Sequence, residues 1–188
     1  VHYYFKAGAS DLLTVTAAQY AMLGEYTQDG HTVLVEASSS YNSWRETYTL
    51  SITYKVDGTK ASPSSVMATG GESLMKLTVS GDVFLYYASG DTKILRKLTA
   101  EEAAQVGLSA YRTIDGKTLY LKGSVTVSEG TFTFGYTFGE SKTPAAVTLE
   151  KQDGVDAYKI GTYNDTVFYA LMSGSKAYIV TAAEYAMY

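Results

Sequence analysis

The stretch Thr131-Phe-Thr-Phe-Gly-Tyr-Thr-Phe138 decides the fold class. Its aromatic residues recur at every second position, which is the side-chain period of a β-strand and not the roughly 3.6-residue period of a helix. The aromatic side chains therefore share one face, and threonine and glycine occupy the other. We expect a long antiparallel strand whose aromatic face belongs to the core, because a row of aromatic side chains in water would promote aggregation.

The same alternation predicts a second long strand from Glu46 to Tyr54, with Tyr48, Leu50, Ile52 and Tyr54 pointing inward. Dipeptides rich in glycine and aspartate interrupt the rest of the chain at short intervals, as turns do. The candidate strands between these turns are residues 2–7, 11–15, 32–38, 44–55, 64–68, 73–79, 83–88, 93–98, 117–127, 131–138, 145–151, 156–161, 166–172 and 176–180.

A patch of small polar residues, Ala-Ser-Pro-Ser-Ser at 61–65, lies between two of these candidate strands. Proline has no N–H to donate and is therefore excluded from the centre of a sheet. We expect this patch to be a loop within a domain and not a linker between domains.

A near-exact repeat marks the organisation of the chain. VTAAQYAM at residues 15–22 returns as VTAAEYAM at residues 180–187, and LTAEEAAQ at residues 98–105 keeps the same frame. The threonines of the three copies are separated by 83 and 82 residues, and each copy follows an aromatic strand, a turn and a second apolar strand. This spacing indicates duplication of a β-rich unit.

Each repeated threonine is followed three residues later by Gln or Glu, which is the pattern of a capping box at the start of a helix. The threonine hydroxyl and the Gln or Glu side chain each accept a bond from an N–H that the helix leaves without a partner. The apolar residue before the threonine and Tyr20 or Tyr185 have the spacing of a hydrophobic staple. A structural role is therefore favoured, and the alternative is that these two tyrosines present their hydroxyls to a ligand.

The expected fold is mainly β, a β-rich α+β arrangement of internally duplicated antiparallel sheets with one short capped helix per repeat. Residues 1–80 would form the first repeat, composed of a hairpin, a helix and a sheet. Residues 81–188 would form the second repeat, with a closing hairpin and a C-terminal helix. Two explanations of that last partial unit stay open, because it could close the second sheet or belong to a longer array.

Composition and charge argue against several classes of function. The formal net charge is -4 and lysines and arginines do not cluster, so nucleic acid is not an expected partner. The chain has no cysteine, which excludes disulfides, thiolate zinc sites and cysteine nucleophiles. No apolar stretch reaches the roughly 20 residues of a membrane-spanning helix, so none is expected in this sequence.

Residues suited to catalysis are scarce. The only histidines are His2, near the start of the sequence, and His31, which follows an Asp-Gly turn, so neither a general base nor a zinc site is favoured. Asp153-Gly-Val-Asp156 offers carboxylates for Ca²⁺ but lacks the spaced acidic ligands of an EF-hand. No nucleophile-elbow, P-loop or dinucleotide-binding pattern occurs. We expect a non-enzyme without catalytic residues, bound metal or cofactor.

Aromatic side chains are the remaining candidates for function. Trp44 is the single tryptophan and lies in the polar segment Ser-Ser-Ser-Tyr-Asn-Ser-Trp-Arg at residues 38–45. Tryptophan and tyrosine present apolar faces with a polar edge, and arginine accompanies them at many interfaces. Trp44, Tyr41 and Arg45 are therefore the candidate contact residues for a ligand or partner. The alternative is that Trp44 and Tyr41 cover the edge of a sheet.

The segments VTAAQY and VTAAEY resemble segments of secreted surface lipoproteins of the Bacteroidetes, in which apolar strands run into a similar short helix. The resemblance lacks the lipid-bearing cysteine and implies no catalytic residue. It implies an extracellular or cell-surface location, with any lipid anchor supplied by residues outside this chain. Such proteins accompany nutrient importers or bind glycans, peptides or partner proteins.

Together these observations predict a surface or secreted binding or accessory module, as a subunit of a cell-envelope assembly such as a nutrient-uptake complex. Its partner would be a protein of that assembly or a glycan. One alternative is a carbohydrate-binding module that uses exposed Trp and Tyr. A second alternative is a structural repeat of an adhesin or filament.

Overall fold

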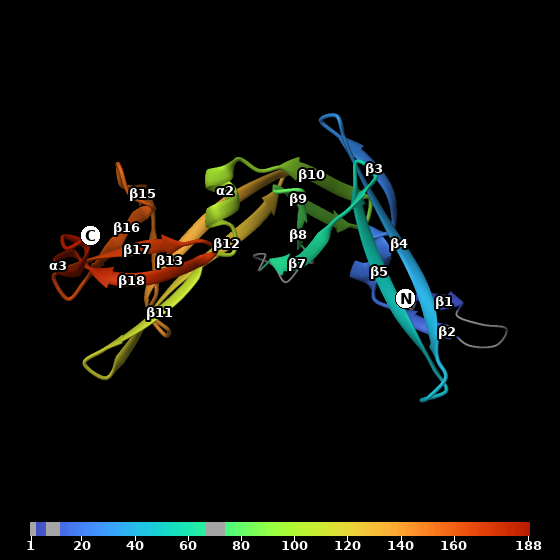
Figure 1. Ribbon diagram of the computed structural model, residues 1–188, viewed down its shortest axis with the longest axis horizontal. Coiled ribbons are helices and arrows are strands. Elements are labelled where there is room, and N and C mark those ends of the chain that lie inside the picture. Colours follow the sequence, from blue (N-terminus) through green and yellow to red (C-terminus); the bar gives the residue numbers. More distant parts are fainter. Residues whose placement is uncertain (1–2, 7–11, 67–73) are drawn as a thin grey trace. The chain divides into compact units, whose positions relative to one another are not determined.

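The computed structural model describes residues 3–6, 12–66 and 74–188. It divides into two compact units, Val1–Ala100 with Glu129–Thr131, and Glu101–Ser128 with Phe132–Tyr188. Both units are built from antiparallel sheets and short helices, so the predicted mainly β class is confirmed (Figure 1). No helix in the described ranges is long and apolar enough to cross a membrane.

Among its described residues, the first unit contains a two-stranded hairpin and two four-stranded sheets, in the orders β3-β4-β5-β6 and β10-β9-β8-β7. Its elements are β1 (Tyr3–Lys6), β2 (Leu12–Val15), α1 (Ala17–Met22), β3 (Gly24–Gln28), β4 (His31–Asn42), β5 (Thr47–Val56), β6 (Thr59–Lys60), β7 (Ser62–Val66), β8 (Leu74–Val79), β9 (Asp82–Ser89) and β10 (Thr92–Lys97).

The second unit repeats this plan with sheets in the orders β11-β12-β13-β14 and β15-β16-β17-β18. Its elements are α2 (Ala100–Gln105), which begins at the boundary between the units, β11 (Ser109–Ile114), β12 (Lys117–Ser128), β13 (Thr131–Glu140), β14 (Ala145–Val147), β15 (Glu150–Lys151), β16 (Ala157–Tyr163), β17 (Thr166–Ser173), β18 (Lys176–Thr181) and α3 (Ala182–Tyr185).

The duplication expected from the sequence is present in the structure. β4 and β12 each have 12 residues, and their partners β5 and β13 each have 10. The strands β9 and β10 open the second sequence repeat. β9 pairs with β8, β10 pairs with β9, and together they complete the second sheet of the first unit. The sequence repeat is therefore offset from the compact unit by one hairpin.

Two-residue turns set the register of the hairpins. Asp29 and Gly30, like Asp115 and Gly116, have positive φ at both positions, which is the type I′ geometry that matches the twist of paired strands. Glycine adopts this backbone without strain, and aspartate tolerates it better than most residues. The two turns occupy equivalent places and start the two longest strands at equivalent residues.

Each unit has its own core between its two sheets. In the first unit the fully buried side chains include Val33 of β4 and Tyr86 of β9, and in the second Leu119 of β12 and Phe168 of β17. Both cores combine residues from both sheets of the unit, as in a β-sandwich. Gln28 closes one side of the first sandwich, since its side-chain oxygen accepts a 2.8 Å bond from the backbone N–H of Leu95.

The aromatic alternation predicted the orientation of β13 correctly. Phe132 and Phe138 are buried, whereas Thr131 and Thr133 on the other face are exposed. On β5 the same face is inward, but only Tyr54 and Val56 are buried, and Tyr48, Leu50 and Ile52 are partly exposed. The outer half of β5 therefore extends beyond the core.

The prediction of a loop at residues 61–65 is wrong. Ala61 is buried in the first core, and the residues after it form β7, in which Pro63 lies opposite Leu77 of β8. β7 is the edge strand of its sheet, where one row of N–H groups is not needed for pairing. A proline is tolerated at this place for that reason.

The strands β3 and β11 were not predicted. They occupy equivalent positions, pair with β4 and β12, and contain few apolar residues. The predicted strand at 145–151 is two short strands, β14 and β15, that belong to different sheets. The predicted strand at 32–38 continues to Asn42, because the outer half of β5 pairs with its polar end.

The predicted helix starts are confirmed. α1 and α3 carry complete capping boxes, with Thr16 and Gln19 exchanging bonds of 3.0 and 3.1 Å, and Thr181 and Glu184 exchanging bonds of 2.8 and 3.3 Å. α2 begins directly after Thr99. The repeated octapeptide thus fixes the point at which a strand turns into a helix.

Candidate functional site

The candidate contact residues lie at the end of a long hairpin formed by β4 and β5 (Figure 1). Val33, Val35, Tyr54 and Val56 anchor the base of this hairpin in the core. Beyond the pair Ala37 and Ile52, the strands remain hydrogen bonded as far as Asn42 and Thr47, but none of their residues is buried. We call the part from residue 38 to residue 51 the arm.

A compact turn forms the end of the arm. The side-chain oxygen of Asn42 accepts bonds from the backbone N–H groups of Trp44, at 3.0 Å, and Arg45, at 3.2 Å. The Asn42 carbonyl accepts a further 3.3 Å bond from Arg45 N–H, and Glu46 closes the turn with φ of 49°. Local asparagine bonds of this kind define the backbone of a turn. Trp44, which was expected at the start of a strand, therefore lies in this turn.

Three aromatic residues gather at the end of the arm. The Trp44 side chain is 96% exposed, so it buries almost none of its surface against the protein, and Tyr41 is 56% exposed. The Tyr41 ring lies 5.1 Å from the ring of Tyr48, with an angle of 49° between their planes. Tyr48 is directly opposite Tyr41 in the strand register. The arm therefore presents an aromatic surface next to the exposed residue Arg45.

Sequence reasoning identified Trp44, Tyr41 and Arg45 but not the two residues that organise them. Asn42 holds the turn, and Tyr48 supports the Tyr41 ring. The strand alternation assigned Tyr48 to the inner face of β5, where a core contact was expected. A four-residue turn between the two strands places Tyr48 directly opposite Tyr41. This register is the signal that could have revealed the pair of tyrosines.

His31 lies in a polar cluster at the base of the same hairpin. Its Nδ1 is 2.8 Å from Asp57 Oδ2, and the other Asp57 oxygen accepts a 2.8 Å bond from Thr32 N–H. These bonds, first from Thr32 and then from His31, hold the pKa of Asp57 below its ordinary value. The His31 ring meets the Phe84 ring edge-on at 5.0 Å. The cluster fastens the turn after β5 to the start of β4.

The remaining titratable candidates are also engaged in local contacts. Asp156, considered for Ca²⁺, pairs with Lys151 at 2.8 Å. Within residues 3–6, 12–66 and 74–188, no group of three His, Asp or Glu side chains is arranged to hold a metal ion. Tyr20 and Tyr185, considered as ligand contacts, stack on Tyr3 and Tyr169, each at 4.1 Å between ring centres.

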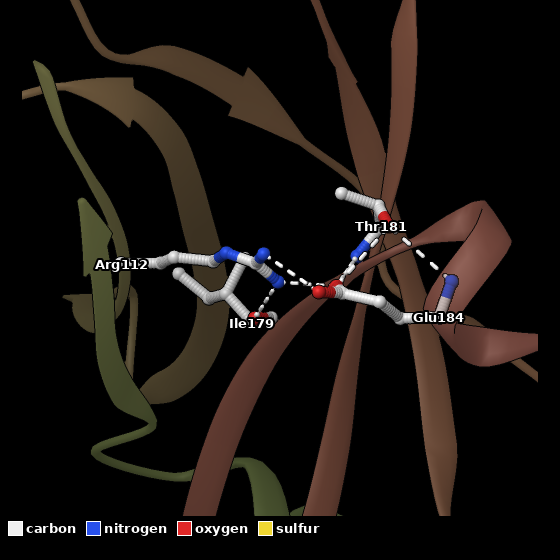
Figure 2. Close-up of polar contacts among 4 residues, drawn as sticks. All are labelled: Arg112, Ile179, Thr181 and Glu184. Atoms are coloured by element: carbon white, nitrogen blue, oxygen red, sulfur yellow. Dashed lines mark hydrogen bonds and ion pairs between the residues drawn. The ribbon is translucent and has the colours of Figure 1, made fainter. Parts of the chain in front are cut away.

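A second polar cluster fastens α3 to β11 in the second unit (Figure 2). Arg112 bonds both carboxylate oxygens of Glu184, one of them at 2.8 Å, and donates a 3.1 Å bond to the carbonyl of Ile179. Glu184 also accepts the 2.8 Å bond from Thr181 N–H. Arg112, and then Thr181, lower the pKa of Glu184 to about 2.

The geometry in Figure 2 gives this cluster a structural role. The guanidinium and the carboxylate satisfy each other, and the remaining bonds go to the strand β18 and to the start of α3. The single difference between the two octapeptides, Gln19 against Glu184, lies at this contact. Gln19 only caps its helix start, whereas Glu184 caps α3 and pairs with an arginine.

No protein-family model, curated protein or solved structure matches this chain. The geometry of the arm is therefore the main guide to function.

Proposed function

We propose that the protein is a non-enzymatic binding module that contacts a protein partner through Trp44, Tyr41 and Arg45 at the end of the arm. The observation that carries the proposal is the 96% exposure of Trp44 in an ordered turn. Tryptophan, tyrosine and arginine are the residues that contribute most to binding at protein interfaces. A turn that fixes these residues before binding reduces the entropy lost on association.

Hydrogen bonds along the arm support this use of the hairpin. Continuous pairing of β4 with β5 out to Asn42 and Thr47 holds the aromatic residues away from the core without a flexible loop. Three serines, from residue 38 to residue 40, and alternating threonines on β5 keep the sides of the arm polar. The apolar surface is thus concentrated at the end, where a partner could bury it.

The angle between the aromatic rings favours a protein partner over a glycan. The carbohydrate-binding alternative requires a planar platform of aromatic rings, whereas the Tyr41 and Tyr48 planes are inclined by 49°. The carbohydrate-binding alternative is tested in the same experiments. A cell-surface location within an envelope assembly is part of the proposal and is supported only by the lipoprotein-like segments around α1 and α3.

The duplication favours a second candidate function, the structural repeat of an adhesin or filament. Two sandwiches of the same plan, each preceded or followed by a capped helix, are the architecture of a modular array. In that case the arm would contact a neighbouring molecule of the assembly. Both candidates assign the contact to the same residues.

Replacing Trp44 by Ala is expected to weaken partner binding strongly without changing the fold. A peptide library selected on the wild-type protein, and a glycan array, would supply ligands, and their affinities would then be measured by calorimetry. Loss of an interface tryptophan costs about 2 kcal/mol or more, or roughly 30-fold in affinity. Thermal unfolding should be unchanged, because the side chain buries almost nothing in the free protein.

Tyr111→Ala is the matched control, because Tyr111 is 74% exposed on β11 in the second unit. Ligands that depend on the arm should bind this variant with wild-type affinity. The proposal would be rejected if the selected peptides bound Trp44→Ala as tightly as wild type. Enrichment of glycans instead of peptides, with the same dependence on Trp44, would favour the carbohydrate-binding alternative.

A further inference from the structure

The hairpin β1–β2 is a third copy of the hairpins β9–β10 and β17–β18. In β1–β2, Tyr3 lies opposite Val15 and stacks on Tyr20 of the following helix. In β17–β18, Tyr169 lies opposite Val180 and stacks on Tyr185 in the same way. Because both helices start with a capping box one residue later, the two hairpins can be aligned residue by residue.

The alignment assigns Tyr4 and Thr14 of the first hairpin to the positions of Ala170 and Ile179. Ala170 and Ile179 are buried in the second core. In contrast, Tyr4 is 59% exposed, Thr14 is exposed, and Leu12 on the same face is 60% exposed.

The hairpin β9–β10 shows the same burial at this position. Counted back from Thr99, the threonine before α2, Phe84 occupies the place of Tyr4 and Ala170, and Lys97 opposite it is exposed. Phe84 belongs to the first core, together with Tyr86 and Leu95 on the same face. The face that forms a core in two hairpins therefore carries exposed apolar side chains in the third. Exposed apolar surface of this kind is typical of an interaction site.

The three hairpins also differ in whether a further strand pairs with the outer edge of their first strand. β9 pairs with β8 on the side away from β10, and β17 pairs with β16 on the side away from β18. In the part of the chain that the structure describes, the sheet of β1 contains only β1 and β2. The edge of β1 thus corresponds to edges that accept a strand in both other copies.

The two accepted strands share a sequence pattern. β8 begins Leu-Met-Lys-Leu and β16 begins Ala-Tyr-Lys-Ile, with Lys76 opposite Leu85 and Lys159 opposite Tyr169. Tyr169 aligns with Tyr3, so a strand added to β1 in the register of β16 would place its lysine opposite Tyr3. The residue before that lysine would lie opposite Tyr4, as Tyr158 lies opposite Ala170.

We propose that the edge of β1 and the exposed face of Tyr4, Leu12 and Thr14 form a docking site for an extended segment of another polypeptide. The segment is an antiparallel strand with apolar residues on both sides of a central lysine, as in β8 and β16. Backbone bonds to β1 would supply affinity, and the apolar residues would supply specificity, as in other cases of strand addition. This surface is separate from the aromatic end of the arm and does not depend on the function proposed for it.

A labelled peptide with the sequence of residues 74–79, LMKLTV, tests the proposal on the full chain. Fluorescence anisotropy should show saturable binding, and hydrogen exchange should show new protection of residues 3–6. A peptide of the same composition in scrambled order should not bind. The lack of saturable binding, or protection at residues 82–89 or 166–173 in place of residues 3–6, would overturn the proposal.

The variant Thr14→Lys places a charge on the proposed docking face and should weaken peptide binding by about tenfold or more, equivalent to about 1.4 kcal/mol. Thr49→Lys introduces the same charge at an exposed position of β5 and should leave binding unchanged. If Thr14→Lys disturbed the hairpin, Leu12→Lys on the same face would replace it. Equal peptide affinity in Thr14→Lys and Thr49→Lys would also overturn the proposal.

Discussion

Replacing Tyr86 by Ala is expected to lower the free energy of unfolding of the first unit by about 3–5 kcal/mol. Tyr86 is fully buried between the two sheets, and its hydroxyl donates a 3.0 Å bond to the carbonyl of Met22 at the end of α1. The substitution removes the ring from the core and leaves that carbonyl without this donor. Urea denaturation followed by circular dichroism would measure the change.

Tyr86→Phe separates the two contributions, because it keeps the ring and removes only the hydroxyl. We expect a loss of about 1–2 kcal/mol from this variant. A loss in Tyr86→Ala no greater than that in Tyr86→Phe would show that the ring contributes little to the core and would contradict the assignment. Trp44 cannot report this unfolding, since it is solvated before and after, so a backbone signal is required.

Burial also makes the first core sensitive to alkali. It raises the pKa of Tyr86 from its ordinary value of about 10 to about 12. The fold therefore favours the neutral phenol, so this contribution to stability is complete below pH 10 and is lost as the pH rises toward 12. In Tyr86→Phe the fall in stability between these pH values should be smaller than in wild type.

The second large effect is expected for Glu184→Ala, which should destabilise the second unit by about 2 kcal/mol. About half of this loss comes from the capping box. The other half comes from the pair with Arg112, whose contribution is limited because the Glu184 side chain is 38% exposed and is screened by solvent. Chemical denaturation would measure the sum.

Glu184→Gln is the matched control, because Gln19 forms the same capping box at the start of α1. This variant should keep the box and lose only the charged pair, with a cost of about 1 kcal/mol. Equal losses in the two variants would mean that the capping box contributes nothing, and equal stability of Glu184→Gln and wild type would mean that the ion pair contributes nothing.

The same pair predicts the behaviour of the second unit in acid. The pKa of Glu184 is about 2 in the folded protein, against an ordinary value of 4.5. The ionised form is the one that the fold favours, so its contribution is present above pH 4.5 and is lost as the pH falls toward 2. Glu184→Gln should show a weaker acid dependence over this interval.

Local patterns predicted the parts of the fold that depend on local chemistry. The alternation in β13 predicted which face of the strand is buried, because one face carries Phe132 and Phe138 and the other carries threonine. The repeated threonines gave the starts of α1, α2 and α3. At α1 and α3 the reason is a capping box, which involves only residues within one turn. Fold class and duplication followed from these features.

Tertiary pairing decided the parts that were missed. β3 and β11 are polar strands that form because β4 and β12 offer them a hydrogen-bonding edge. β7 accommodates Pro63 because it lies at the edge of a sheet, a position that composition alone does not reveal. The polar neighbours of Trp44 left two alternatives open, a contact residue or a cover for the edge of a sheet, and its 96% exposure depends on the turn held by Asn42. The pairing of Glu184 with Arg112 joins residues 72 positions apart, and no local pattern predicts it.

The offset between sequence repeat and compact unit, described above for β9 and β10, constrains how such a protein can be divided or extended. A chain cut after residue 80 would keep β7 and β8 but lose the two strands that complete their sheet. Insertion or removal of one whole repeat, between equivalent points of two copies, would instead keep the order of hairpin, helix and sheet. Tandem duplication within a gene could therefore lengthen this architecture one complete sandwich at a time, without a cut that falls between domains.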